Sequence, residues 1–253
     1  MKVRAVGSSR QIQDILGFMT TKSFFDPAVE VPIRRAASVL LLRAADIGFE
    51  VFIQHRVSTM DFAAGMVVYP GGRVDAQDAE LVRSGAIDAR LLAEQAQRWV
   101  HSTVWDEGEQ QAPFRAGEML AAARREVFEE TGLLLDPEQL RPWANWVTPV
   151  GYPKRFDTYF YTAVLREDQE PRHQTTEAAI SNWIHPEALF AALERKEIKM
   201  MRPTQRTLLD AMELGSIAAL GSFDREIIPV HPTGKDTNTS TPVLDAELRP
   251  RQD

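Results

Sequence analysis

Short segments rich in Val, Leu, Ile and aromatic residues recur along the chain, and they predict the strands of a sheet. Ala36–Arg43 and Phe49–Arg56 are the clearest of them, and Ala45–Gly48 between them carries the Asp and Gly of a hairpin turn. A short apolar run follows at Met66–Tyr69 and ends at Pro70-Gly71-Gly72, a strong turn signal. Further strands are expected at Trp143–Val150, Arg155–Leu165, Ile180–Ile184 and, as the last strand, Phe223–Val230.

Helical periodicity appears between these segments. In Gly117–Thr131 the residues Leu120, Ala123 and Val127 form an apolar stripe, and Gly132 suits the left-handed residue that ends a helix. Two more helices are expected at Pro186–Lys196 and Pro203–Leu214. Because strands and helices mix without regular βαβ spacing, the pattern favours an α/β (α+β) fold in which helices flank a mixed sheet.

The stretch from Asp75 to Arg115 is polar and Ala-rich, and it is predicted to be a helical insertion with one amphipathic helix at Ala89–Val100. Its apolar residues need burial, either against the core or against a second subunit. These residues are Leu91, Leu92, Trp99, Val100, Val104 and Trp105. The predicted organisation is a leader over 1–35 with a short helix around Gln11–Met19, a domain over 36–230 with its insertion at about 76–115, and a flexible tail over 231–253.

Composition excludes several classes of function. The 253 residues carry a formal net charge of −7, so the overall field repels nucleic acid and anionic membranes. No segment approaches the ~18–20 apolar residues of a membrane span, and the absence of cysteine removes disulfides and thiolate sites. We therefore expect a cytoplasmic protein, with a homodimer left open as its assembly. The five histidines are scattered without metal-ligand spacing and are expected to be structural or surface residues.

The segment Arg125–Leu133 carries the candidate chemistry. Glu126, Glu129 and Glu130 stand at i, i+3 and i+4, so a helix places their carboxylates about 5–6 Å apart on one face. Such like charges repel one another unless a cation binds them, and hard cations such as Mg²⁺ prefer oxygen ligands. Arg125 is four residues before Glu129 and can orient a carboxylate. A solvated acidic face is the alternative, and the preceding glycine turn argues against it because glycine lets the backbone approach a ligand.

Arg125–Leu133 resembles the second half of the Nudix box, Arg-Glu-(apolar)-X-Glu-Glu-X-Gly-(apolar), at all nine positions. Gly71-Gly72 is similar to the glycine pair that opens the box. The acidic residue usual eight positions before the arginine falls on Gly117, with Glu118 one place off, and about forty residues replace a short spacer. The branch with a long insertion inside the box, which includes peroxisomal coenzyme A diphosphatases, is similar in this respect. Weaker similarities to that branch occur at Gln54-His55-Arg56, Tyr69–Asp75, Thr148-Pro149, Arg155–Thr158, Trp183, Pro186–Leu189 and Arg202–Thr204.

The resemblance implies an α/β/α sandwich and a hydrolase of the diphosphate linkage in nucleoside diphosphate-X compounds, with coenzyme A or acyl-coenzyme A as candidates. It implies Mg²⁺ or Mn²⁺, held by Glu126, Glu129, Glu130 and the Gly71 carbonyl, with Arg125 orienting the glutamates. Glu126 is the first choice for the water-activating base and Glu177 the second. Arg56, Arg73 and Arg155 are the candidate substrate contacts, and Asp157 lies beside the last of them.

Three readings compete at this stage. A diphosphohydrolase is favoured by the intact glutamates, a non-catalytic nucleotide-binding Nudix-like module is the alternative, and a purely structural acidic helix is the third. The coenzyme A signature expects an arginine five places after Arg56, where this chain has Asp61. Isopentenyl diphosphate isomerases share the fold but need a cysteine, which this chain does not contain.

Overall fold

The computed structural model describes residues 30–57, 63, 65–224 and 226–232. Seven strands form one mixed sheet with the order β3-β2-β1-β6-β5, while β4 pairs with β1 and β7 pairs with β2. Strands β1 and β6 run parallel over ten residue pairs, and the other pairs are antiparallel. The bounds are β1 Ile33–Ala44, β2 Phe49–Arg56, β3 Val67–Val68, β4 Gly71–Arg73, β5 Arg141–Val147, β6 Arg155–Val164 and β7 Ala178–Ile184.

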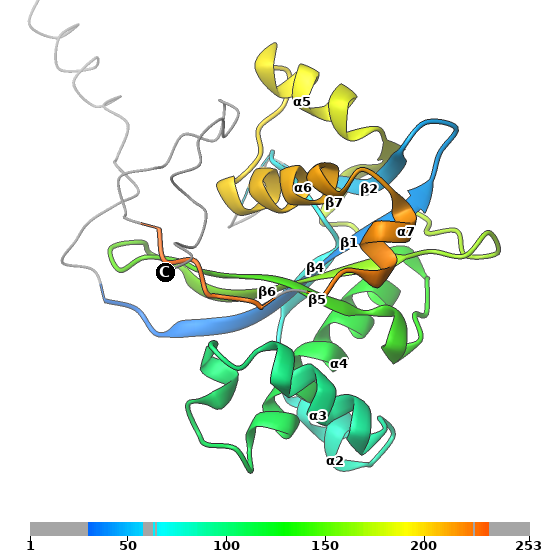
Figure 1. Ribbon diagram of the computed structural model, residues 1–253. Helices are drawn as coiled ribbons and strands as arrows, with labels where there is room; N and C mark the ends of the chain where they lie inside the picture. The colour runs from blue at the N-terminus through cyan, green and yellow to red at the C-terminus, as the bar shows by residue number, and fades with distance from the viewer. Residues whose placement is uncertain (1–29, 58–62, 64, 225, 233–253) are drawn as a thin grey trace, which may run out of the picture.

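Helices cover both faces of this sheet (Figure 1). On one face lie α2 (Ala76–Arg83), α3 (Ala89–Arg98) and α4 (Ala112–Thr131), with the short 3₁₀ turn η1 (Thr103–Trp105). On the other lie α5 (Pro186–Glu194), α6 (Arg202–Leu214) and α7 (Ile217–Ser222). A second 3₁₀ turn, η2, spans Pro137–Gln139. The predicted α/β/α sandwich with a mixed sheet is confirmed.

Alternation along β1 produces two cores. Val39 and Leu41 face α4 and the inserted helices, whereas Leu40 and Leu42 face α6 and α7. Successive strand side chains point to opposite faces, so a strand buried on both sides is a continuous apolar run. The run Val39–Leu42 is entirely buried, and this explains why its sequence does not alternate between apolar and polar residues.

The insertion packs against the core of its own chain. Trp99 and Val104 are fully buried in the same cluster as Leu120 and Val127 of α4. Trp99 meets Tyr159 and Tyr161 of β6 edge-to-face at 5.0 and 5.5 Å between ring centroids. Packing against the core is therefore found for five of the six predicted residues, and Val100 is exposed. The insertion contains more helix than predicted. Helix α2 precedes the predicted helix α3, and α4 already begins within the insertion, at Ala112.

The prediction of a last strand at Phe223–Val230 was wrong. The segment 217–222 is helix α7, and Val230 forms only an isolated bridge to Trp146 of β5. Pro229 lacks a backbone N–H and so cannot extend a ladder at its own position. Two of its apolar residues pack singly instead: Phe223 contacts Trp143 edge-on, and Ile227 is buried in the core beneath the sheet, whereas Ile228 is exposed.

Several boundaries moved by a few residues. β1 begins at Ile33 and not at Ala36, and the hairpin turns at Gly48 in the left-handed conformation, as expected. The expected helix at Gln11–Met19 and the tail residues 233–253 lie outside the described residues. Within the part of the chain that the structure describes, no helix is long and apolar enough to cross a membrane.

Candidate active site

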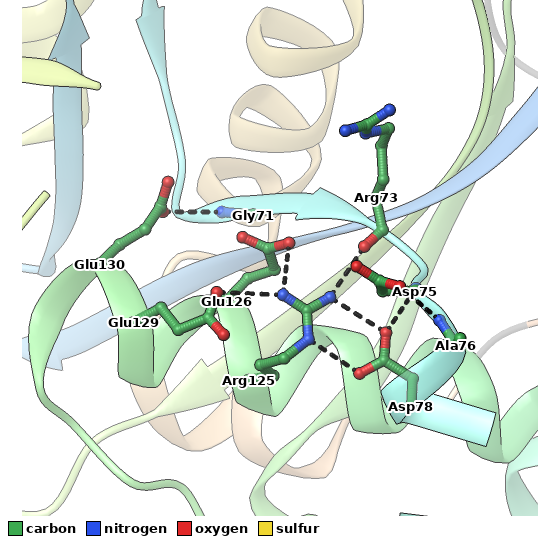
Figure 2. A network of polar contacts seen from close by, with 9 residues as sticks. All are labelled: Gly71, Arg73, Asp75, Ala76, Asp78, Arg125, Glu126, Glu129 and Glu130. Atoms are coloured by element: carbon green, nitrogen blue, oxygen red, sulfur yellow. Dashed lines mark hydrogen bonds and ion pairs between the residues drawn. The ribbon is translucent and has the colours of Figure 1, made fainter. Parts of the chain in front are cut away.

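The last turns of α4 lie beneath Gly71 at the start of β4 (Figure 2). The Gly71 N–H donates a hydrogen bond to Glu130 Oε2 at 3.0 Å. Glu130 is only 5% exposed, and burial raises the pKa of its carboxyl to about 8 although the Gly71 hydrogen bond opposes this rise. The structure thus brings Gly71 and Glu130 together through the N–H of Gly71, whereas the resemblance implied its carbonyl as a metal ligand.

Gly72 makes the close approach of β4 to α4 possible. A Cβ at this position would overlap the Glu126 carboxyl group, whose Cδ and Oε2 would lie 2.5 and 2.6 Å away. A side chain at this position would displace the Glu126 carboxylate from its present place. Burial raises the pKa of the Glu126 carboxyl, and the adjacent Arg125 guanidinium opposes the rise. Two glutamates of the helix therefore meet the two glycines of the turn.

Arg125 connects the carboxylates. Its Nη1 donates to Glu126 Oε1 at 2.8 Å and to Glu129 Oε2 at 3.1 Å, and its Nη2 donates to the Arg73 carbonyl at 2.8 Å. The guanidinium fork therefore fixes two glutamates relative to β4 (Figure 2). Glu129 is half exposed, with 51% of its side-chain surface accessible, so of the three glutamates it is the one most open to solvent.

Asp78 of α2 completes the Arg125 network, and sequence reasoning missed it. Its Oδ1 and Oδ2 accept from Arg125 Nε and Nη2 at 2.9 and 3.0 Å, and its side chain is 2% exposed. Oδ2 also accepts from the Asp75 N–H at 2.7 Å, which closes a capping box at the start of α2. The spacing Asp75-x-x-Asp78 was an available signal for the start of a helix, but it does not predict the contact of Asp78 with Arg125.

The structure explains why the expected acidic position carries Gly117. A Cβ at Gly117 would lie 2.8 Å from Leu92 of α3 and 2.9 Å from Val82 of α2. The inserted helices thus dock where that side chain would stand, and Asp78 brings a carboxylate to Arg125 from the insertion. Glu118, one place on, forms an ion pair with Arg115 at 2.9 Å and makes no recorded contact with Arg125.

The donor atoms suit a hard divalent cation, because they are carboxylates beside a turn whose backbone is accessible. In their present orientations, however, no group of three His, Cys, Asp or Glu residues is arranged to hold a metal ion in the described residues. Arg125 donates to one carboxylate oxygen each of Glu126 and Glu129, and the Gly71 N–H donates to one oxygen of Glu130. The chemistry of the donor set fits the ion, and these side chains must turn to bind it.

Arg56, a predicted substrate contact, and Glu177, the second choice for the base, pair with each other. Arg56 Nη2 and Glu177 Oε2 form an ion pair at 2.9 Å, and the Val57 N–H donates to the Glu177 carbonyl at 3.0 Å. Both charges act on the helix carboxylates, since Arg56 lowers the pKa of Glu130 and Glu177 raises that of Glu126, each as a minor contribution beside burial. Arg56 and Glu177 therefore border the glutamate cluster.

The other two arginines lie differently. Arg73 joins the cluster through its carbonyl, whereas its side chain points away from the glutamates (Figure 2). Arg155 Nε donates to the Thr148 carbonyl at 3.1 Å, at the start of β6. Asp157 is 1% exposed and accepts from Thr103 Oγ1 of η1 and from Asn145 Nδ2 at 2.5 and 2.6 Å. No recorded contact joins Arg155 or Asp157 to the glutamates.

Comparison with known proteins agrees with this geometry. Residues 113–210 match the family model described as NUDIX domain. A Caenorhabditis elegans protein named "Putative nudix hydrolase 7" is 29% identical over 154 residues, which are 60% of this chain and 52% of that relative. The match thus spans about half the length of the curated relative. The crystal structure of a NUDIX hydrolase from Alicyclobacillus acidocaldarius superposes with a TM-score of 0.61 at 23% identity, over 81% of this chain and 100% of the other.

Residues 113–210 are thus similar to a NUDIX domain, and the fold of the chain is that of the NUDIX hydrolase structure. The matched stretch begins at Pro113, at the end of the insertion, so the glycine turn lies outside it. The tertiary structure joins the two parts of the site. It places Gly71 beside Glu130 and Gly72 beside Glu126, although more than fifty residues separate each pair in the sequence.

Proposed function

We propose that the protein is a metal-dependent hydrolase of the diphosphate linkage in nucleoside diphosphate-X compounds. The observation that carries the proposal is the joint placement of Glu126, Glu129 and Glu130 by Arg125 and the Gly71 turn. Three carboxylates on one helical turn are stable only with compensating positive charge, and Arg125 alone contacts two of them. The third, Glu130, is buried and accepts the Gly71 N–H, and a divalent cation would stabilise its deprotonated form.

In this proposal Glu126, Glu129 and Glu130 hold Mg²⁺ or Mn²⁺, and the Gly71 carbonyl contributes a further oxygen. The ion would neutralise the charge of the diphosphate and make a water molecule more acidic. Arg125 keeps the carboxylates on one face, and Asp78 keeps Arg125 in place. Gly72 carries no side chain that would overlap the Glu126 carboxylate.

Glu126 is the proposed water-activating base. Its raised pKa brings the carboxyl closer to the range in which a base accepts a proton efficiently. Glu177 is the alternative base, and it would first have to leave its ion pair with Arg56. Arg56 is a proposed phosphate contact because its largely buried Nε has no hydrogen-bond partner among the described residues, so a donor remains available.

The substrate class is a nucleotide-type small molecule, and coenzyme A and acyl-coenzyme A are candidates within it. Arg73 and Arg155 are the further proposed substrate contacts. Asp61, where the coenzyme A signature expects arginine, lies outside the described residues. We also propose that the protein is cytoplasmic and forms a homodimer. Light scattering of the purified protein tests the homodimer, because it measures the mass of the particle in solution.

The test is a substrate panel in Mg²⁺ and Mn²⁺, with coenzyme A, dinucleotides, ADP-ribose and nucleotide sugars and with identification of the products. Hydrolysis of at least one compound, reduced about a hundredfold or more in Glu129→Gln, supports the proposal. Glu138→Gln is the matched control, because it removes a carboxylate at the surface turn η2 and leaves activity unchanged. Complete inactivity of the wild-type protein on the whole panel overturns the proposal.

A non-catalytic nucleotide-binding module is the second candidate. One observation favours this candidate. Each of the three glutamates already accepts a hydrogen bond from Arg125 or from the Gly71 N–H without a bound ion. Calorimetry that shows tight nucleotide binding with no product in the presence of metal would select this candidate.

A further inference from the structure

Gln54 of β2 carries a buried amide that the fold does not use. The residue is 1% exposed, and its Nε2 makes no hydrogen bond with any described residue. A buried donor without an acceptor lowers the stability of a protein, and most buried polar side-chain atoms in native structures are hydrogen-bonded. Such a group is explained if it serves a state of the molecule in which its acceptor is in place.

Strand alternation places the Gln54 side chain on the face of the sheet that α4 covers. Phe52, two residues earlier, belongs to the core cluster of α4, whereas Ile53 belongs to the cluster on the α6 side. Arg56, two residues later, follows the same alternation and acts on the Glu130 carboxyl. The side chains of Gln54 and Arg56 therefore both face α4.

The Gln54 amide lies beside the Glu130 carboxylate. Gln54 pairs in register with Val68 of β3, three residues before Gly71, so the sheet brings it near the glycine turn. Burial raises the pKa of the Glu130 carboxyl, and the Gly71 N–H and the Gln54 side chain both oppose this rise. The Gly71 N–H is already engaged with Glu130 Oε2 at 3.0 Å. Gln54 is thus a second donor at the same carboxylate, close to it and without a hydrogen bond of ordinary geometry.

We infer that Gln54 is a positioning residue for the metal site: its Nε2 donates to the Glu130 carboxylate when that side chain has turned to bind a divalent ion. The inference rests on the proposed function, which places Glu130 among the metal ligands. In this role Gln54 touches neither the ion nor the substrate and acts through Glu130 alone.

The present orientation of Glu130 explains why a second donor is needed. Its hydrogen bond with Gly71 fixes Oε2, and a carboxylate that turns toward the ion leaves that donor. Carboxylates that bind metals are themselves hydrogen-bonded, and these bonds fix the orientation of the ligand. Arg56 Nε also lacks a partner in the described part of the chain, but its guanidinium is paired with Glu177. Among the described residues Gln54 has no such competing partner, so its amide is the donor that Glu130 can take up.

Gln54→Met tests this role, because methionine has a similar length and carries no donor. Mn²⁺ binding, measured by electron paramagnetic resonance of the free ion, should weaken about tenfold in this variant. The Tm of the metal-free variant should equal or exceed that of wild type, because the substitution removes a donor that has no acceptor. Weaker ion binding together with an unimpaired fold is a combination that a merely structural role does not produce.

Gln95→Met is the matched control. Gln95 of α3 is 4% exposed, and its Nε2 donates to the Leu140 carbonyl at 2.9 Å. This variant should have a lower Tm, since that carbonyl loses its donor, and should bind Mn²⁺ as wild type does. Wild-type Mn²⁺ affinity in Gln54→Met overturns the inference, and so does equal weakening in the two variants. If Gln54→Met does not fold, Gln54→Leu takes its place.

Nuclear magnetic resonance of the wild-type protein tests the hydrogen bond itself. At saturating Mg²⁺, one proton of the Gln54 side-chain NH₂ group should move downfield, as expected for a donor to a carboxylate. The signal is identified by its absence in Gln54→Met or Gln54→Leu. An NH₂ signal that does not move downfield overturns the inference.

These measurements do not depend on turnover, so they separate the role of Gln54 from the hydrolase proposal. If Gln54→Met weakens Mn²⁺ binding while no panel compound is hydrolysed, the positioning role stands and the hydrolase proposal fails. If wild type hydrolyses a panel compound and Gln54→Met binds Mn²⁺ with wild-type strength, only the positioning role is overturned. Absence of Mn²⁺ binding in wild type overturns the positioning role, and the substrate panel then decides the hydrolase proposal by itself.

Discussion

Asp78 of the inserted helix α2 holds Arg125 of α4 through two hydrogen bonds of 2.9 and 3.0 Å. Arg125 in turn contacts Glu126 and Glu129, so a residue of the insertion positions the carboxylates of the candidate site. The insertion is consequently part of the machinery that shapes the site. It is joined to the sheet as well, because Thr103 donates to the buried Asp157.

Replacing Asp78 should therefore affect both stability and activity. Asp78→Asn leaves the buried side of Arg125 without its charge partner, and the expected loss is roughly 3 kcal/mol of unfolding free energy. Activity on any panel substrate should fall as well, because Glu126 and Glu129 lose their fixed orientation. Urea denaturation and kcat/KM measure the two effects. Glu80→Gln, on the exposed side of the same helix, is the control, and equal behaviour of the two variants would contradict the positioning role.

Gly72→Ala should disable the site while the fold survives. The added methyl group would overlap the Glu126 carboxylate, so that side chain must move away from β4. We expect at least a tenfold loss of kcat/KM and weaker Mn²⁺ binding. Gly221→Ala in α7 is the matched control, since no atom lies within 4 Å of its Cβ position. A Gly72→Ala variant with wild-type kinetics would show that the close approach of β4 has no functional role.

An acidic residue at position 117 should destabilise the folded protein. Gly117→Glu would push a charged side chain between Val82 and Leu92, where the inserted helices pack on α4. Overpacking and an unpaired buried carboxylate together should cost about 3 kcal/mol or more in unfolding free energy. Thermal and urea denaturation measure this loss. An active Gly117→Glu variant of unchanged stability would mean that the insertion does not dock as tightly as described.

The metal-free protein should lose stability as the pH rises from about 4.5 to about 8. Burial raises the pKa of Glu130 to about 8 and also raises that of Glu126, so the folded state binds more protons than the unfolded state across this window. The slope of unfolding free energy against pH is then negative for these two groups. Saturating Mg²⁺ should reverse their contribution, because ions bind the deprotonated carboxylates. Denaturation across pH compares wild type with Glu130→Gln, and the same slope in both would contradict the assignment.

The parts of the site that lie close together in the sequence could be predicted from it. Glu126, Glu129 and Glu130 share one helical turn with Arg125, so spacing alone places them. The contact of Gly71 with Glu130 joins residues 59 positions apart, and it was accessible only through the resemblance to the Nudix box.

Contacts that depend on tertiary packing could not be predicted. Asp78 was missed because counting backward from Arg125 gives Gly117, and only the docked insertion shows which acid reaches the guanidinium. The expected strand at Phe223–Val230 failed for a related reason. Two of its apolar residues pack singly on Trp143 and the core, and apolar composition does not distinguish such packing from a strand.

The central claim is that the glutamates of α4 bind a divalent ion beside the glycine turn. Titration of the metal-free protein with Mn²⁺, followed by electron paramagnetic resonance of the free ion, measures this binding directly. The account predicts saturable binding in wild type that weakens at least about tenfold in both Glu126→Gln and Glu130→Gln. Mn²⁺ binding of wild-type strength in both variants, or no binding in wild type at millimolar concentrations, would contradict it.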